Sequence, residues 1–130
     1  MALYLDTSAF FKLVMDEDHS VTLRQHLAES DTPLVSSDLM RVEAMRAARR
    51  HSPEVATAVR ARLDVMTLLT LSTTICERAG ELDPGIPRSL DAMHLASALT
   101  LGDDLAAIVT YDNRLASAAA AHGVAILAPR

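Results

Sequence analysis

Four acidic side chains, far apart in the sequence, are the residues best placed to take part in chemistry. They are Asp6, Glu43, Asp91 and Asp112. Asp6 and Asp112 each follow a short apolar run typical of a buried strand, and the other two acids lie early in helical segments. Carboxylates that gather in one place repel one another, so a cation or a proton has to neutralise them. Mg²⁺, with Mn²⁺ as an alternative, suits such oxygen ligands and can activate water for phosphodiester hydrolysis.

Each acid also has a purely structural explanation when it is taken alone. Three of them could cap a helix or complement the dipole of its first turn. Glu43 could instead pair with Arg46 or Arg50 on one face of a helix. A fold does not need all four acids at one edge, however, and their shared placement therefore favours a site.

The elements that would position these acids alternate between short apolar runs and amphipathic segments. We expect strands at residues 2–5, 33–36, 65–71, 105–110 and 124–127. We expect helices at residues 9–15, 21–29, 39–50, from 53 onward, 73–82, 90–101 and 113–122. The alternation predicts a single α/β domain over residues 1–130 with a mostly parallel sheet. Carboxyl ends of parallel strands and the helices that follow them share one edge, where the four acids are expected to meet.

Turn and cap residues mark several of the expected boundaries. Pro53 is well placed at the first position of a helix, directly after Ser52. The clearest loop covers residues 83–87, and Ser89 is expected to cap the helix that follows it. Gly123 is expected to end the alanine-rich helix before the last strand.

The composition limits the class of protein. Half of the 130 residues are hydrophobic, which is enough for one core. The single cysteine, Cys76, excludes a cysteine-based zinc site and an internal disulfide, and we expect it to be buried. We recognise no signal peptide and no membrane-spanning stretch, and expect a soluble, cytoplasmic protein with no membrane partner. The net charge of −5 mildly disfavours a nucleic-acid partner, unless the acids gather in one metal site, where bound cations reverse the local field.

Four short motifs resemble, in order, those of PIN-domain proteins. They are residues 4–9 (YLDTSA), 37–44 (SDLMRVEA), 90–98 (LDAMHLASA) and 109–115 (VTYDNRL). Each motif contains one of the four acids, and together they span nearly the whole chain. The small size and the lack of an appended domain resemble the VapC toxins of type II (VapBC) toxin–antitoxin systems.

The resemblance implies a five-stranded, mostly parallel sheet in the order 3-2-1-4-5, flanked by helices. It implies an endoribonuclease that depends on Mg²⁺ or Mn²⁺ and cleaves a structured RNA, such as tRNA or ribosomal RNA. The four acids would be its catalytic metal ligands, for one or two ions. It also implies a homodimer and a cognate VapB-type antitoxin. An arginine of that antitoxin could fill the acid pocket.

Hydroxyl residues beside the acids have candidate supporting roles. Ser8 either hydrogen-bonds the Asp6 carboxylate or a metal-bound water, or caps a helix, whereas Thr7 is expected only to cap. Thr110 could steady Asp112 or a bound phosphate, although a threonine at a strand end needs no function.

Histidine and arginine side chains near the acids also have two interpretations each. His94 lies one turn beyond Asp91, where a packed histidine is favoured over a general base. Arg46 and Arg50 share the helix face of Glu43 and could contact RNA or the antitoxin, or simply form a solvated face.

Rival families fit the sequence less well. A haloacid dehalogenase-type phosphatase needs a second acid two residues after Asp6, where Ser8 stands. A receiver domain needs a late lysine, and Lys12 is the only lysine. One alternative stays open, namely a catalytically silent PIN-fold module that binds RNA or a protein without cutting.

Overall fold

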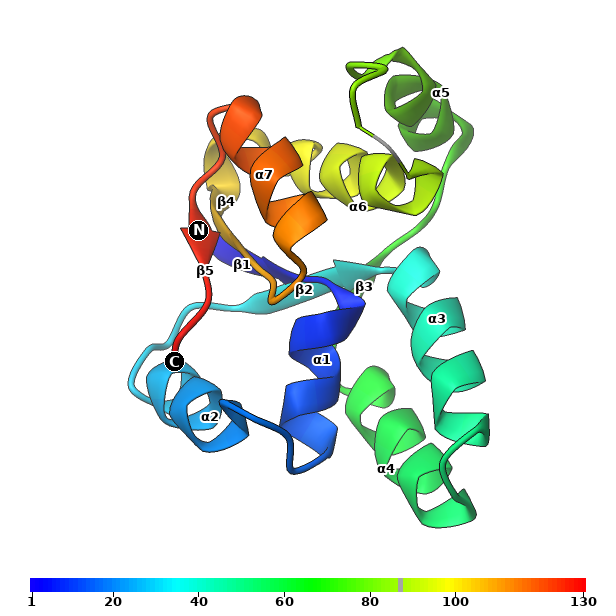
Figure 1. The fold of residues 1–130 in the computed structure, drawn as a ribbon, viewed down its shortest axis with the longest axis vertical. Helices are drawn as coiled ribbons and strands as arrows, with labels where there is room; N and C mark the ends of the chain where they lie inside the picture. Colours follow the sequence, from blue (N-terminus) through cyan, green and yellow to red (C-terminus); the bar gives the residue numbers. More distant parts are fainter. Residues whose placement is uncertain (87) are drawn as a thin grey trace.

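The chain places a parallel sheet between two layers of helices (Figure 1). The computed structural model describes residues 1–86 and 88–130. The strands are β1 (Ala2–Leu5), β2 (Leu34–Ser37), β3 (Thr67–Leu69), β4 (Leu105–Val109) and β5 (Ile126–Leu127). The helices are α1 (Thr7–Val14), α2 (Ser20–Ala28), α3 (Asp38–Arg49), α4 (Pro53–Asp64), α5 (Thr73–Glu81), α6 (Ser89–Leu99) and α7 (Asn113–Ala121). Among the described helices, none has the length and apolar character needed to cross a membrane.

Strand β1 lies at the centre of the sheet, and both of its neighbours run parallel to it. The order is β3-β2-β1-β4-β5, which confirms the predicted fold class and strand order. Tyr4 of β1 pairs with Val35 of β2 and with Ile108 of β4. All of β1 is buried, as expected for a strand that helices cover on both faces. The chain leaves β1 and β4 at the same edge, just before Asp6 and Asp112.

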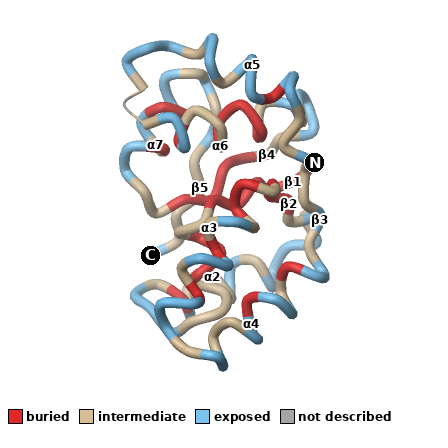
Figure 2. The backbone as a smooth tube through the Cα atoms, turned by 90° about the vertical axis from the view of Figure 1, so that its right-hand side faces the viewer, coloured by how far each residue is buried: buried red, intermediate tan, exposed pale blue. Residues whose placement is uncertain are grey.

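The two faces of the sheet pack against different helices. Successive side chains of a strand point to opposite faces, and so Tyr4 and Leu5 belong to different clusters. Tyr4 packs with Leu95 of α6 and with residues of α7, while Leu5 packs with Leu23 of α2 and with α1. The buried residues form a band through the middle of the molecule, between exposed outer surfaces (Figure 2).

A third cluster fixes the helix that carries Glu43. Phe10 of α1, Met40 and Ala44 of α3 and Leu63 of α4 pack together and are almost completely buried. Ala44 anchors its turn of α3 in this cluster, and the partly buried Glu43 beside it contacts α1 and α6 instead. The packing of α3 therefore holds the one predicted acid that does not follow a strand or begin a helix.

Most element boundaries match the predictions, but the residue predicted to cap α6 is wrong. Ser52 caps α4 by accepting a hydrogen bond from the backbone N–H of Val55, and Pro53 is the first helical residue. Ser89, however, is the first residue of α6, and Arg88 occupies the cap position without a capping side-chain hydrogen bond. The expected loop is described only as far as residue 86, because Pro87 lies outside the described residues.

The edge strands and the cysteine differ from the predictions as well. β3 and β5 contain 3 and 2 residues, because each pairs on one side only and its ladder is short. Val65, predicted as strand, instead caps the end of α4 and is exposed. Cys76 is exposed rather than buried, because α5 packs mainly against α6 and the preceding residue, Ile75, takes the buried position.

We expect Leu95→Ala to lower the free energy of unfolding by about 2–5 kcal/mol, since it leaves a cavity in the core. Leu90→Ala, in the same helix, is the matched control, because Leu90 is 48% exposed while Leu95 is 0% exposed. Its loss should stay below about 1.5 kcal/mol. Urea denaturation measures both, and equal losses would contradict the described packing.

Candidate active site

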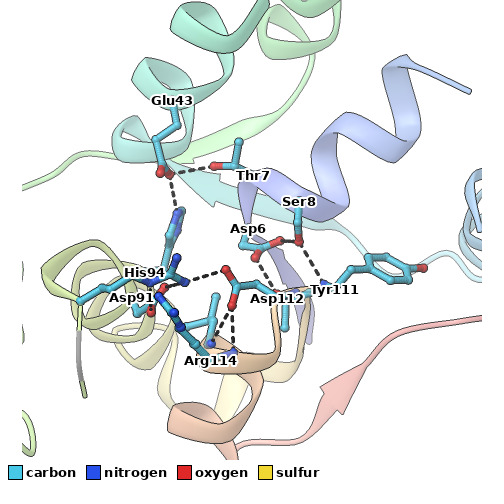
Figure 3. A network of polar contacts seen from close by, with 12 residues as sticks. Asp6, Thr7, Ser8, Glu43, Asp91, His94, Tyr111, Asp112 and Arg114 are labelled. Atoms are coloured by element: carbon cyan, nitrogen blue, oxygen red, sulfur yellow. Dashed lines mark hydrogen bonds and ion pairs between the residues drawn. The ribbon is translucent and has the colours of Figure 1, made fainter. Parts of the chain in front are cut away.

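All four predicted acids line one pocket of about 120 Å³ at the carboxyl edge of the sheet. Figure 3 shows their side chains converging from the residues just before α1 and α7 and from within α3 and α6. The pocket is lined by Asp6, Thr7, Ser8, Glu43, Arg88, Leu90, Asp91, His94 and Asp112. The structure thus brings together acids that lie up to 106 residues apart in the sequence, while their catalytic role stays a prediction.

Asp6 is the most firmly held of the four acids. It is 4% exposed and caps α1, with Oδ1 accepting hydrogen bonds from Ser8 Oγ at 2.7 Å and from the N–H of Ala9 at 3.0 Å. Its Oδ2 accepts from Thr110 Oγ1 at 2.5 Å. Burial raises the pKa of Asp6, and these hydrogen bonds offset the effect only in part. A bound cation would therefore favour the ionised form of a carboxylate that burial disfavours.

Ser8 and Thr110 each connect the ends of β1 and β4. Besides donating to Asp6, Ser8 Oγ accepts from the N–H of Tyr111 at 3.0 Å. Thr110 Oγ1 likewise accepts from the N–H of Asp112 at 3.0 Å. The interpretation of Ser8 as an Asp6 partner is therefore the one that the structure shows, and Thr110 contacts both acids rather than Asp112 alone.

Asp91 and Asp112 share a partner that the sequence did not reveal, the guanidinium of Arg88. Arg88 Nε and Nη2 donate to the two oxygens of Asp91 at 2.8 and 2.9 Å, and Nη2 also donates to Asp112 Oδ2 at 2.6 Å. Asp112 Oδ1 caps α7 through the N–H groups of Arg114 and Leu115. Partial burial acts to raise the pKa of Asp112, but Arg88 and these N–H groups outweigh it and lower the pKa.

Glu43 is held by α1 and α6 rather than by the arginines on its own helix. Its Oε1 accepts from Thr7 Oγ1 and from His94 Nε2, both at 2.7 Å. Thr7 is thus a partner of Glu43, and the expectation that it only caps a helix was wrong. Burial acts to raise the pKa of Glu43, but the hydrogen bond and charge of His94, with the bond from Thr7, lower it overall.

His94 links Glu43 to the interior of the protein. It is 4% exposed, and its Nδ1 lies 2.9 Å from the hydroxyl of Tyr4, which donates to Ser37 Oγ at 2.9 Å. Burial raises the pKa of Tyr4 to about 12, so this tyrosine stays neutral at physiological pH. The packed-histidine interpretation fits this environment, and the packing fixes the ring nitrogen that holds Glu43.

The chemistry of these side chains fits a hard divalent cation, because the acids offer carboxylate oxygens only. Within residues 1–86 and 88–130, however, no three acidic, histidine or cysteine side chains stand close enough together to hold one ion. Arg88 takes part of that space, since it pairs with two of the four carboxylates. The side chains therefore suit a metal ion in type, and their present arrangement suits a guanidinium.

An open groove continues from the acid pocket and shares Thr7 and Ser8 with it. The groove measures about 440 Å³, and its other lining residues are Phe11, Lys12, Glu17, Ala47, His51 and Tyr111. Arg46 and Arg50 are exposed at the later part and the end of α3, and line neither cavity. Their contact with RNA or an antitoxin stays a prediction.

Comparison with known proteins gives a consistent family. The PIN domain family matches residues 3–121. Ribonuclease VapC46 of Mycobacterium tuberculosis is 42% identical, over 98% of this chain and 98% of its own length. The match therefore includes all four acid positions within a nearly full-length alignment.

Solved structures with low sequence identity share the fold. The crystal structure of Mycobacterium tuberculosis VapC20, described as a sarcin–ricin loop cleaving toxin, has a TM-score of 0.77 at 20% identity, over 98% of this chain and 100% of that one. VapBC2 from Rickettsia felis, bound to a DNA fragment from its promoter, has a TM-score of 0.74 at 13% identity, with 100% of both chains covered. The fold found here is thus common to distant chains.

We expect Tyr4→Phe to lower the free energy of unfolding by about 1–3 kcal/mol, because it leaves His94 and Ser37 without their buried hydroxyl partner. Tyr111→Phe is the matched control, since its partly buried hydroxyl donates to the carbonyl of Pro129 near the chain end. Water can replace that bond, and a loss below about 1 kcal/mol is expected. Urea denaturation tests the pair, and a smaller loss for the Tyr4 variant would contradict the described network.

Proposed function

The chain belongs to the VapC branch of the PIN-domain family, and we propose that it is an endoribonuclease toxin that hydrolyses RNA at the acid pocket with a divalent cation. The observation that carries the proposal is the convergence of four carboxylates, two from helices and two from the residues before helices, at one edge of the sheet. Open parallel sheets bind their ligands at this edge. Asp6 and Asp112 also cap helices, whereas Glu43 and Asp91 make no capping hydrogen bond among the described contacts.

Asp6, Glu43, Asp91 and Asp112 would hold Mg²⁺, with Mn²⁺ as a substitute. Such an ion supplies the positive charge that activates water and stabilises the departing oxygen. The protein's own part is to fix the carboxylates. Ser8 and Thr110 orient Asp6, while Thr7 and His94 orient Glu43.

The groove beside the pocket is our candidate path for the RNA strand. The acid pocket is small and polar, whereas the groove has more than three times its volume and is open to solvent. A phosphate would enter the pocket while a neighbouring nucleotide lies along the groove. Lys12 lines the groove, and its Nζ lies 4.8 Å from the centroid of the Tyr111 ring, so the groove offers a cation for the RNA backbone.

A structured RNA, such as tRNA or ribosomal RNA, is the proposed substrate class. VapC20, which shares the fold, is described as cleaving the sarcin–ricin loop, and this supports the class without identifying the target. The narrow pocket is also better suited to a strand displayed by RNA structure than to reading a long sequence.

A VapB-type antitoxin is the proposed partner. Its inhibitory segment would carry a cationic side chain, because the acid pocket already accommodates a guanidinium on two of its carboxylates. The structural neighbour VapBC2 carries the name of a VapB–VapC pair, which supports this class of partner. A homodimer stays a prediction. The alternative of a silent binding module gains no support, since all four acids are present.

We expect Asp6→Asn and Asp91→Asn to abolish RNA cleavage by the antitoxin-free protein. The loss should exceed the roughly 10–100-fold typical of residues that only support a metal ligand. Asp103→Asn is the control for charge, because Asp103 is exposed in the 3₁₀ turn Gly102–Asp104 and does not line the pocket. Total RNA is incubated with Mg²⁺, with Mn²⁺ or with chelator, and new ends are sequenced.

Discrete cuts that require metal and disappear in both pocket variants would support the proposal. Cuts that persist in the variants would reveal a contaminating nuclease. Absence of cleavage in any metal, from folded protein free of its partner, would favour the silent module.

A further inference from the structure

The side chain of Arg88 lies in the acid pocket and pairs with most of the carboxylate oxygens of two of the acids. Both oxygens of Asp91 accept from its guanidinium, and so does Oδ2 of Asp112. The remaining oxygen of Asp112, Oδ1, caps α7. All four oxygens of this pair of carboxylates are therefore engaged, three of them by one side chain.

We propose that Arg88 is an internal counter-ion, which holds Asp91 and Asp112 in the cation-free protein and has to leave them when a divalent cation binds. The inference rests on the proposed function, because it concerns how the same pocket takes up its metal. A guanidinium and a metal ion compete for the same oxygen lone pairs, and their positive charges repel each other. Arg88 therefore sets the cation concentration at which the site fills.

The surroundings of Arg88 allow it to leave without disturbing the fold. Its side chain is 41% exposed, in contrast to 7% for that of Asp91. It stands at the cap position of α6 but makes no capping hydrogen bond, so the helix start does not depend on its side chain. Asp91 is buried and its contact with Arg88 is two-pronged, so the incoming cation has to replace the positive charge that Arg88 takes away. Once the cation does so, displacement of Arg88 into solvent requires only the rotation of one side chain.

The other two acids are held by groups that do not compete in this way. Asp6 accepts from hydroxyls and from one backbone N–H, and these donors lie within α1 and just beyond β4. Glu43 is held by Thr7 and by the buried His94. The hydroxyls and the backbone N–H are uncharged and the His94 ring is buried, so Arg88 is the movable cation among the described contacts of the four acids.

The expected size of the effect follows from the population of the open site. If Arg88 covers the acids for about 90% of the time, the apparent affinity for a cation falls about 10-fold below its intrinsic value. Arg88→Gln removes the competitor and keeps a side chain of similar length. We therefore expect Arg88→Gln to bind Mn²⁺ about 10-fold more tightly than the natural protein.

The test is isothermal titration of Mn²⁺ into the full-length, antitoxin-free protein and its variants. Arg114→Gln is the matched control, because it removes the same charge close to Asp112. Among the described contacts, Arg114 reaches Asp112 through its backbone N–H and not through its side chain. Arg114→Gln should change the Mn²⁺ affinity by less than about 3-fold, through long-range charge alone. Arg88→Lys keeps a positive charge without the two-pronged contact, and an intermediate affinity is expected.

A second readout follows Arg88 itself in the natural protein. The Nε–H of Arg88 donates to Asp91, so the NMR signal of this guanidinium N–H should be protected from solvent exchange without a cation. Titration with Mg²⁺, which is diamagnetic, should shift this signal and remove its protection. A signal that stays unchanged while Mg²⁺ saturates the site would overturn the inference.

The titration outcomes separate this inference from the proposed function. If the natural protein binds Mn²⁺ and Arg88→Gln binds it equally or more weakly, the counter-ion role is wrong and the metal site stands. If neither Arg88 variant nor the natural protein binds Mn²⁺ while circular dichroism shows them folded, the metal-dependent function fails and this inference fails with it. Tighter binding by Arg88→Gln but not by Arg114→Gln supports the counter-ion role.

Discussion

Repulsion between carboxylates at one edge of the sheet is the constraint on which the rest of the site depends. Four acids in a pocket of about 120 Å³ cannot remain ionised without compensation. Hydroxyl and N–H donors compensate Asp6, and a histidine compensates Glu43. The guanidinium of Arg88 compensates both Asp91 and Asp112. The polar residues around the pocket therefore share one role, which is to offset the repulsion between the carboxylates.

The fold itself supplies part of the positive potential that offsets the carboxylates. α1, α6 and α7 all begin at this edge, so their N-terminal dipoles direct positive potential at the pocket. Asp6, Asp91 and Asp112 lie at these three helix starts. Glu43 alone lies in the middle of a helix, beyond the reach of such a dipole. It is also the acid that contacts His94, and this histidine supplies the stabilisation that a helix N-terminus gives the other three acids.

Sequence patterns could predict what is local and repeated. Hydrophobic periodicity located nearly every strand and helix, and the parallel arrangement then placed the four acids at one edge. What they missed depends on tertiary contacts. Arg88 reaches Asp112 across 24 residues, and His94 reaches Glu43 across 51, so no local pattern encodes either pair. The spacing of Arg88 and Asp91, three residues apart, was the one available signal.

Two of the acids have a second duty. Asp6 and Asp112 cap α1 and α7, whereas Glu43 and Asp91 cap nothing. Asparagine caps a helix about as well as aspartate but binds metal less strongly. A lineage released from selection for activity would therefore tend to keep a capping residue at two of these positions while the other two diverged. In such descendants the capping positions 6 and 112 would still resemble the motif after activity was lost, because folding alone would conserve them.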